Sequence, residues 1–115
     1  MGRTYEPNNK QISDFDINFA GARVLALISD HVGFAVHYEG EMPEYFDIDP
    51  LWNASDAEAR KAAEKLESAP RGGWIPIYQI SVAKKWFAGT LDEFTGFVSE
   101  WAAFLKNCNG YSVPM

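Results

Sequence analysis

The stretch from Thr90 to Leu105 constrains the fold more than any other part of the sequence. Thr90 and Glu93 have the spacing of a capping box, in which each side chain bonds a free backbone N–H at the start of a helix. Large apolar residues then recur every three or four positions, which places them on one face of an α-helix. Burying each of them is worth about 1.5–3 kcal/mol, so we expect this helix to be the main core donor. The apolar positions are Leu91, Phe94, Phe97, Val98, Trp101, Phe104 and Leu105.

Ser55 and Glu58 form a second capping-box pattern, ahead of a helix that we expect to end near Glu67. Its apolar side is thin and consists mostly of alanines, which is typical of a helix at the surface. Pro70 and the glycines that follow it end this helix.

Residues 13–28 allow two interpretations. Ser13 can cap a helix, and the stretch from Ala20 to Leu27 is rich in helix formers, so we favour a helix. The alternative for its first part is a strand, because apolar and polar residues alternate there. The alternating apolar residues are Phe15, Ile17 and Phe19.

Three further segments have the patterns of strands. Residues 32–39 alternate between apolar and polar positions, as a half-buried strand does. Residues 44–48 fit a short second strand that Asp49 and Pro50 end. Residues 74–82 are apolar on both faces and fit a covered strand, with Pro76 at an edge or a bulge because proline lacks an N–H.

The order helix, strand, strand, helix, strand, helix predicts an α+β fold, with a small, mostly antiparallel three-stranded sheet and two or three helices packed on it. A chain of 115 residues is expected to form a single domain over residues 1–115. Residues 1–10 and 107–115 are rich in polar residues, glycine and proline, and we expect both ends to lie loosely on the surface.

The net charge of −6 disfavours direct binding to nucleic acid or to an anionic membrane, and it suits a basic protein partner. Cys108 is the only cysteine, so no intramolecular disulfide can form and a reducing compartment is expected. The sequence has no signal-peptide pattern and no apolar run of about 20 residues that could span a bilayer. We therefore expect a cytoplasmic protein.

The residues that carry catalysis or bind metals in other proteins form no recognisable motif. His31 and His37 lack the further nitrogen or sulfur ligands that a zinc site requires. The neighbours of Cys108 do not resemble those of an activated thiol. Lys84, Lys85 and Trp86 could hold a nucleotide, but Trp86 is better explained as cover for the core. We assign no catalytic residue, metal or cofactor.

Residues 39–52, which we call the acidic-aromatic segment, combine acids with aromatic residues. No lysine or arginine occurs from Val24 to Ala59. A solvated loop would explain this composition. The alternative is a docking surface, because aromatic residues provide contact area and acids steer a basic partner into place. The predicted partner-binding residues are Glu39, Glu41, Glu44, Tyr45, Phe46, Asp47, Asp49 and Trp52.

Two short motifs resemble the NinX family of lambdoid phage proteins. They are ISDFDIN at residues 12–18 and NASDA at residues 53–57, in the same order and at similar spacing. The family's later Asn-Pro-Leu-Arg-Ala-Ala element has no counterpart here. The resemblance implies a phage or prophage accessory protein without an established activity.

Together these features predict a non-catalytic binding protein, a phage accessory protein or inhibitor, that docks onto a basic, nucleic-acid-binding host or defence protein. One alternative is an immunity protein that neutralises a toxin. Another is a self-associating accessory protein, a homodimer in which Tyr45, Phe46 and Trp52 bury against a second copy. A third is a small enzyme that uses His31 or His37.

Overall fold

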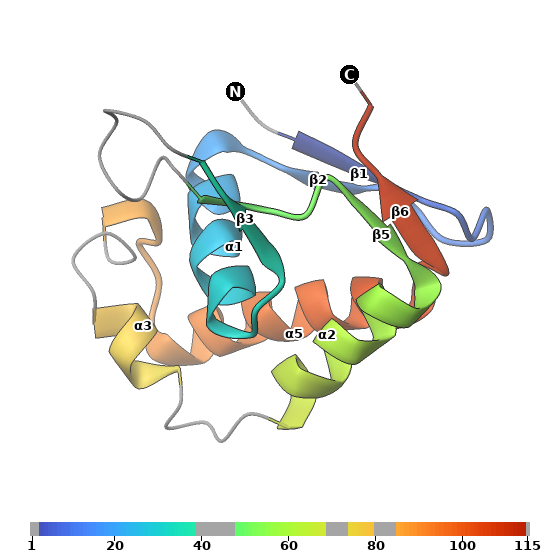
Figure 1. The fold of residues 1–115 in the computed structure, drawn as a ribbon. Helices are drawn as coiled ribbons and strands as arrows, with labels where there is room; N and C mark the ends of the chain where they lie inside the picture. Colours follow the sequence, from blue (N-terminus) through green and yellow to red (C-terminus); the bar gives the residue numbers. More distant parts are fainter. Residues whose placement is uncertain (1–2, 39–47, 69–73, 80–84, 115) are drawn as a thin grey trace.

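The structure, a computed structural model, describes residues 3–38, 48–68, 74–79 and 85–114, and it has the predicted α+β class (Figure 1). The sheet is larger than the expected three strands: four antiparallel strands lie in the order β2-β1-β6-β5, and β3 and β4 form a separate two-stranded sheet. The strands are β1 (Arg3–Pro7), β2 (Phe15–Ile17), β3 (Ala35–His37), β4 (Ile48–Pro50), β5 (Asn53–Ser55) and β6 (Gly110–Ser112). The helices are α1 (Phe19–His31), α2 (Asp56–Ser68), α3 (Ile75–Gln79) and α5 (Leu91–Asn107).

The two ends of the chain form the middle of the larger sheet, so the expectation that they lie loosely on the surface is wrong for β1 and β6. Glu6 and Pro7 pair with Ser112 and Tyr111. Tyr5 from β1 and Tyr111 from β6 are both buried, with ring centroids 5.3 Å apart. Burial of these two rings supplies the apolar area that the polar composition of the ends concealed.

Each of the two interpretations of residues 13–28 is right for a different part of the segment. Phe15–Ile17 forms β2, which pairs with β1, and α1 begins only at Phe19. The N-cap of α1 is Asn18, whose side chain accepts a hydrogen bond from the backbone N of Gly21 at 2.7 Å. Ser13 does not cap the helix, because the extended strand lies between it and α1.

The small β3–β4 sheet matches its predicted strands only in part. Ala35, Val36 and His37 pair antiparallel with Pro50, Asp49 and Ile48. Asp49 and Pro50 therefore belong to β4 instead of ending it. Residues 39–47, which include most of the predicted second strand, lie outside the described residues.

The strand predicted for residues 74–82 is wrong, because Ile75–Gln79 is the short helix α3. Pro76 is compatible with the first turn of a helix, where a missing N–H costs no hydrogen bond. The backbone N of Tyr78 donates to the carbonyl of Trp74 at 2.9 Å. Burial of Trp74 and Ile77 shows that an apolar run of this kind can cover a core as a helix. Residues 80–82 lie outside the described residues.

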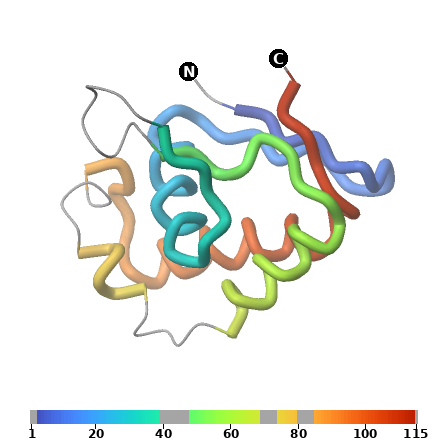
Figure 2. Tube along the Cα trace, in the orientation of Figure 1, coloured from blue at the N-terminus to red at the C-terminus, as the bar shows by residue number. Residues whose placement is uncertain are grey.

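Both capping boxes are confirmed. Thr90 accepts from the backbone N of Glu93 at 3.2 Å, and Ser55 accepts from that of Glu58 at the same distance. As predicted, α5 is the main core donor, and its residue Trp101 is fully buried. Figure 2 shows α5 passing along α2 and beneath α1. These helices enclose the core between themselves and the sheet.

Candidate functional site

A buried ion-pair cluster lies beneath the β3–β4 hairpin. The Oδ1 atom of Asp49 is 2.6 Å from Nη2 of Arg23 in α1 and 2.8 Å from Nη1 of Arg3 in β1. Arg23 also donates from Nη1 to the carbonyl oxygen of Ile48 at 3.2 Å. Asp49 is only 5% exposed, so its prediction as a partner-binding residue is wrong. A buried carboxylate requires opposite charge nearby, and here it joins three elements of the fold.

Two aromatic residues lie next to this cluster. The guanidinium carbon of Arg3 is 4.1 Å from the centre of the Trp52 ring, and Trp52 Nε1 donates to the hydroxyl of Tyr38. Trp52 is half-buried, whereas Tyr38 is 42% exposed. Tyr38 was not among the predicted partner-binding residues, although it follows the alternating pattern of the strand before it.

The remaining predicted residues lie in the connection between β3 and β4. Because His37 pairs with Ile48, the described chain leaves β3 and re-enters β4 at neighbouring positions. The residues between them are outside the described part of the structure. They include Glu39, Glu41, Glu44, Tyr45, Phe46 and Asp47.

The histidines and the cysteine have contacts within the fold. Nε2 of His37 lies 2.6 Å from Oδ1 of Asp30 and links β3 to the end of α1. The ring of His31 lies 5.3 Å from that of Trp74. Cys108 is buried, and this burial raises the pKa of its thiol. Among the described residues there is no group of three or more His, Cys, Asp and Glu that could hold a metal ion.

The basic-aromatic residues after α3 lie close to the core. Nζ of Lys85 is 5.4 Å from the centre of the Trp86 ring, and that ring lies 5.4 Å from Phe19. Phe87 contacts Phe94, with ring centroids 5.6 Å apart. These contacts support the interpretation of Trp86 as cover for the core. Lys84 is outside the described residues.

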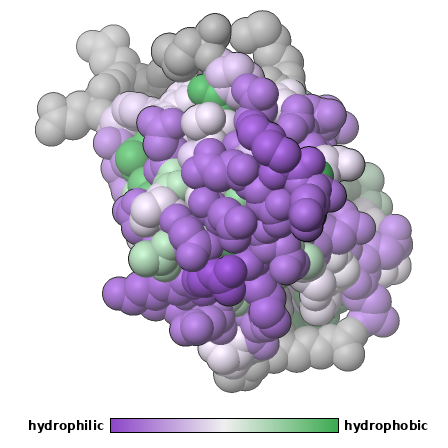
Figure 3. Space-filling view, turned by 90° about the vertical axis from the view of Figure 1, so that its right-hand side faces the viewer, coloured by the Kyte–Doolittle hydropathy of each residue, from purple (hydrophilic) through white to green (hydrophobic). Residues whose placement is uncertain are grey.

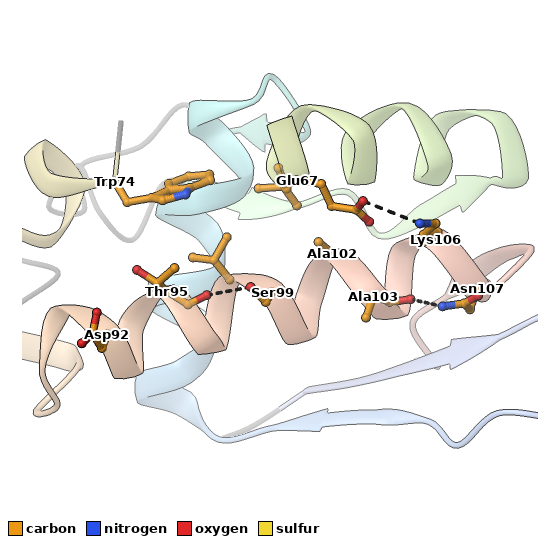
Figure 4. A pocket seen from close by; sticks show the side chains of 11 residues that line it. Glu67, Trp74, Asp92, Thr95, Ser99, Ala102, Ala103, Lys106 and Asn107 are labelled. Atoms are coloured by element: carbon orange, nitrogen blue, oxygen red, sulfur yellow. Dashed lines mark hydrogen bonds and ion pairs between the residues drawn. The ribbon is translucent and has the colours of Figure 1, made fainter. Parts of the chain in front are cut away.

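A groove of about 820 Å³ runs along the outer side of α5, and we call it the α5 groove (Figure 4). The Thr95 hydroxyl donates to the carbonyl of Leu91 at 2.9 Å, and the Ser99 hydroxyl donates to that of Thr95 at 3.1 Å. Both hydroxyl protons are therefore engaged by the backbone, and the charged side chains that line the groove are those of Glu67, Asp92 and Lys106. It is lined by Leu66, Glu67, Trp74, Asp92, Thr95, Val98, Ser99, Ala102, Ala103, Lys106 and Asn107.

The α5 groove was not predicted from the sequence, because the apolar pattern of α5 describes only the face of the helix that packs into the core. A signal was present on the opposite face, where Ser99 and Ala103, which both line the groove, are small and exposed. Another part of the surface has a different character: Figure 3 shows the side of the molecule that lies at the right in Figure 1, and its side chains are mostly hydrophilic.

Among the described residues, no helix is both long and apolar enough to cross a membrane. Comparison with protein-family models, with curated proteins and with solved structures finds no match to this chain. The resemblance of residues 12–18 and 53–57 to the NinX family therefore stays a prediction.

Proposed function

We propose that this protein is a non-catalytic binding protein that holds a basic partner protein with its acidic-aromatic segment. The partner's basic surface is of the kind that otherwise binds nucleic acid. The observation that carries the proposal is the antiparallel pairing of β3 with β4, in which His37, shortly before the acidic-aromatic segment, lies opposite Ile48. Hairpin connections are frequent binding elements because rigid strands position them.

The charge of this region supports the proposal. Its two arginines, Arg3 and Arg23, both bond Asp49. The five acids of the acidic-aromatic segment, counted against these two arginines, leave three negative charges. A local excess of one sign raises the rate of encounter with an oppositely charged surface.

The aromatic residues at the base of the hairpin support it as well. Tyr38 is exposed, and it accepts a hydrogen bond from Trp52, whose ring is also held against Arg3. Side chains that are already fixed lose less conformational entropy on binding. Tyrosine and tryptophan are also the residues most enriched among those that dominate binding energy.

The test is a charge reversal that leaves the buried Asp49 intact. The variant Glu39→Lys, Glu41→Lys, Glu44→Lys is compared with wild type in capture from a host lysate, followed by calorimetry with the purified partner. A matched control reverses three exposed acids elsewhere, namely Asp14, Glu64 and Glu100, and so changes the net charge equally.

We expect the segment variant to lose binding, the control to retain it, and wild-type affinity to fall with rising salt. Salt-insensitive binding, or equal losses in the two variants, would contradict the proposal. The identity of the captured protein separates the alternatives, since a toxin would make this an immunity protein. Genes of a phage early operon beside the coding sequence would support the phage origin.

A further inference from the structure

A small pocket lies between α2 and the turn that follows α1 (Figure 1), and we call it the α2 pocket. One side of it is formed by the turn from Val32 to Phe34, and the other by α2 and by Leu51 in the connection from β4 to β5. Its volume is about 200 Å³, and it shares no residue with the α5 groove. Pockets for drug-sized ligands measure roughly 300–1,000 Å³, so this one is suited to a smaller molecule.

The floor of the α2 pocket is apolar. Phe34 and Ala62 line it and are each only 4% exposed, and Val32 and Leu51 are half-buried beside them. Gly33 has a φ of 72°, and a Cβ atom added to it would have no other atom within 4 Å, so there is open space beside the turn. The floor can therefore take up an apolar group, which gains free energy in proportion to the apolar area removed from water.

Two lysines border the α2 pocket on the side of the helix. Lys61 and Lys65 are four residues apart and share a helix face with Ala62, so both side chains line the pocket. Both lysines are exposed, and among the described residues neither has an ion-pair or hydrogen-bond partner. Their ammonium groups are therefore available to an anion.

Glu58 is the remaining charged residue of the pocket. Its Oε1 atom accepts a hydrogen bond from the backbone N of Ser55 at 3.0 Å, and this bond lowers the pKa of the Glu58 carboxyl. The carboxylate is therefore ionised and held by the start of α2. Two lysines and one glutamate leave one positive charge at the pocket, in a chain whose net charge is −6.

The backbone of residues 32–34 offers no free N–H group to a ligand. The N–H groups of Val32 and Phe34 donate to the carbonyl of Ser29 at 3.2 and 2.7 Å, and that of Gly33 donates to the carbonyl of Asp30 at 3.0 Å. The donors for a bound anion are therefore the two lysines, each of which acts as a compact point charge. This arrangement suits a single carboxylate, whereas phosphate sites commonly use backbone N–H groups at a nest or a helix N-terminus.

We infer that the α2 pocket binds a small apolar monocarboxylate, whose apolar group lies on Phe34 and whose carboxylate is held by Lys61 and Lys65. The apolar group is buried on the floor, and the ammonium groups donate charge-assisted hydrogen bonds to the carboxylate. One negative charge on the ligand matches the one positive charge of the pocket. The inference goes beyond the proposed function and does not rest on it, since the pocket contains none of the predicted partner-binding residues.

A titration with benzoate, followed by NMR of the backbone amides, tests the chemistry of the ligand. Benzoate joins one apolar ring to one carboxylate. We expect saturable shifts at Gly33, Lys61 and Lys65, with a Kd of about 1 mM or tighter, as suits a ligand of few atoms. Benzamide has the ring without the charge, and acetate has the charge without the ring. Each should bind more weakly than benzoate by about tenfold or more, because each loses one of the two contributions.

A pair of double variants tests the position of the site. Lys61→Gln, Lys65→Gln removes both ammonium groups from the pocket, and we expect it to weaken benzoate binding by about tenfold or more. The matched control is Lys10→Gln, Lys106→Gln, which changes the net charge equally at two exposed lysines outside the pocket and should retain binding. Circular dichroism checks that both variants keep the helix content of the wild type.

Three results would overturn the inference. One is the absence of saturable shifts at the pocket with benzoate up to about 10 mM, beyond the weak end of specific affinities. Another is benzamide or acetate binding as tightly as benzoate, which would remove the need for either the charge or the ring. The third is an equal loss in the two double variants, which would indicate attraction to net charge alone. Failure of the Glu39, Glu41 and Glu44 reversals to affect partner binding would leave this inference unchanged.

Discussion

Replacing Asp49 by alanine should destabilise the fold strongly, because it removes the carboxylate that two arginines share. The side chain of Arg23 is only 6% exposed, whereas that of Arg3 is 20% exposed and can reach water. Breaking a buried ion pair by removing one partner costs about 3–5 kcal/mol. Since small domains are stable by about 5–15 kcal/mol, we expect a large fraction of the stability to be lost. Urea denaturation, followed by circular dichroism and tryptophan fluorescence, measures this loss.

The control for this prediction is an exposed ion pair. Nε of Arg60 lies 2.9 Å from Oδ1 of Asp56, and the two side chains are 51% and 49% exposed. Arg60→Ala should therefore cost no more than about 0.5 kcal/mol. If Asp49→Ala cost no more than Arg60→Ala, the reasoning about the buried cluster would be refuted. The double variant Arg23→Ala, Asp49→Ala should lose less stability than the sum of the two single variants.

Three further predictions concern the core and the helix ends. Ser29→Ala removes the hydroxyl that accepts from Nε1 of the buried Trp101 at 3.1 Å, and calorimetry should show a loss of about 1–3 kcal/mol. Thr90→Ala removes the N-cap of α5 and should cost about 1 kcal/mol in urea denaturation, with serine restoring most of it. Burial raises the pKa of Tyr5 to about 12 and also raises the pKa of Tyr111. Stability should be unaffected by these tyrosines below about pH 10 and should fall above it by about 1.4 kcal/mol per pH unit for each, because the unfolded chain ionises first. In a variant whose other three tyrosines are replaced by phenylalanine, ultraviolet absorbance of tyrosinate that appeared before unfolding would contradict this last prediction.

The parts of the fold that the sequence predicted correctly depend on neighbours along the chain. The capping boxes at Thr90 and Ser55 and the apolar face of α5 are of this kind, since their partners lie within a few turns of helix. Where two local patterns competed, the outcome was mixed. The segment 13–28 divided into β2 and α1, because pairing with β1 selected the strand for Phe15–Ile17. The apolar run after Trp74 became α3, since burial alone does not distinguish a helix from a strand.

The candidate site was only partly predictable, because some of its contacts join residues that are distant in the chain. The sequence identified the acids and aromatic residues of the acidic-aromatic segment and the absence of bases around them. It did not reveal that Asp49 is buried, because its partners Arg3 and Arg23 are distant in the chain. Nor did it reveal the α5 groove, whose wall includes Trp74 from another element.

By itself, then, the sequence determined the helices that carry their own start signals, the α+β class and the acidic character of the chain. The tertiary structure decided which strands pair, which charges are buried and where a groove lies. Those features arise when residues far apart in the chain meet, as β1 and β6 do when the two ends pair around Tyr5 and Tyr111. Their free energy comes from burial and charge pairing between distant segments, which a local pattern does not record.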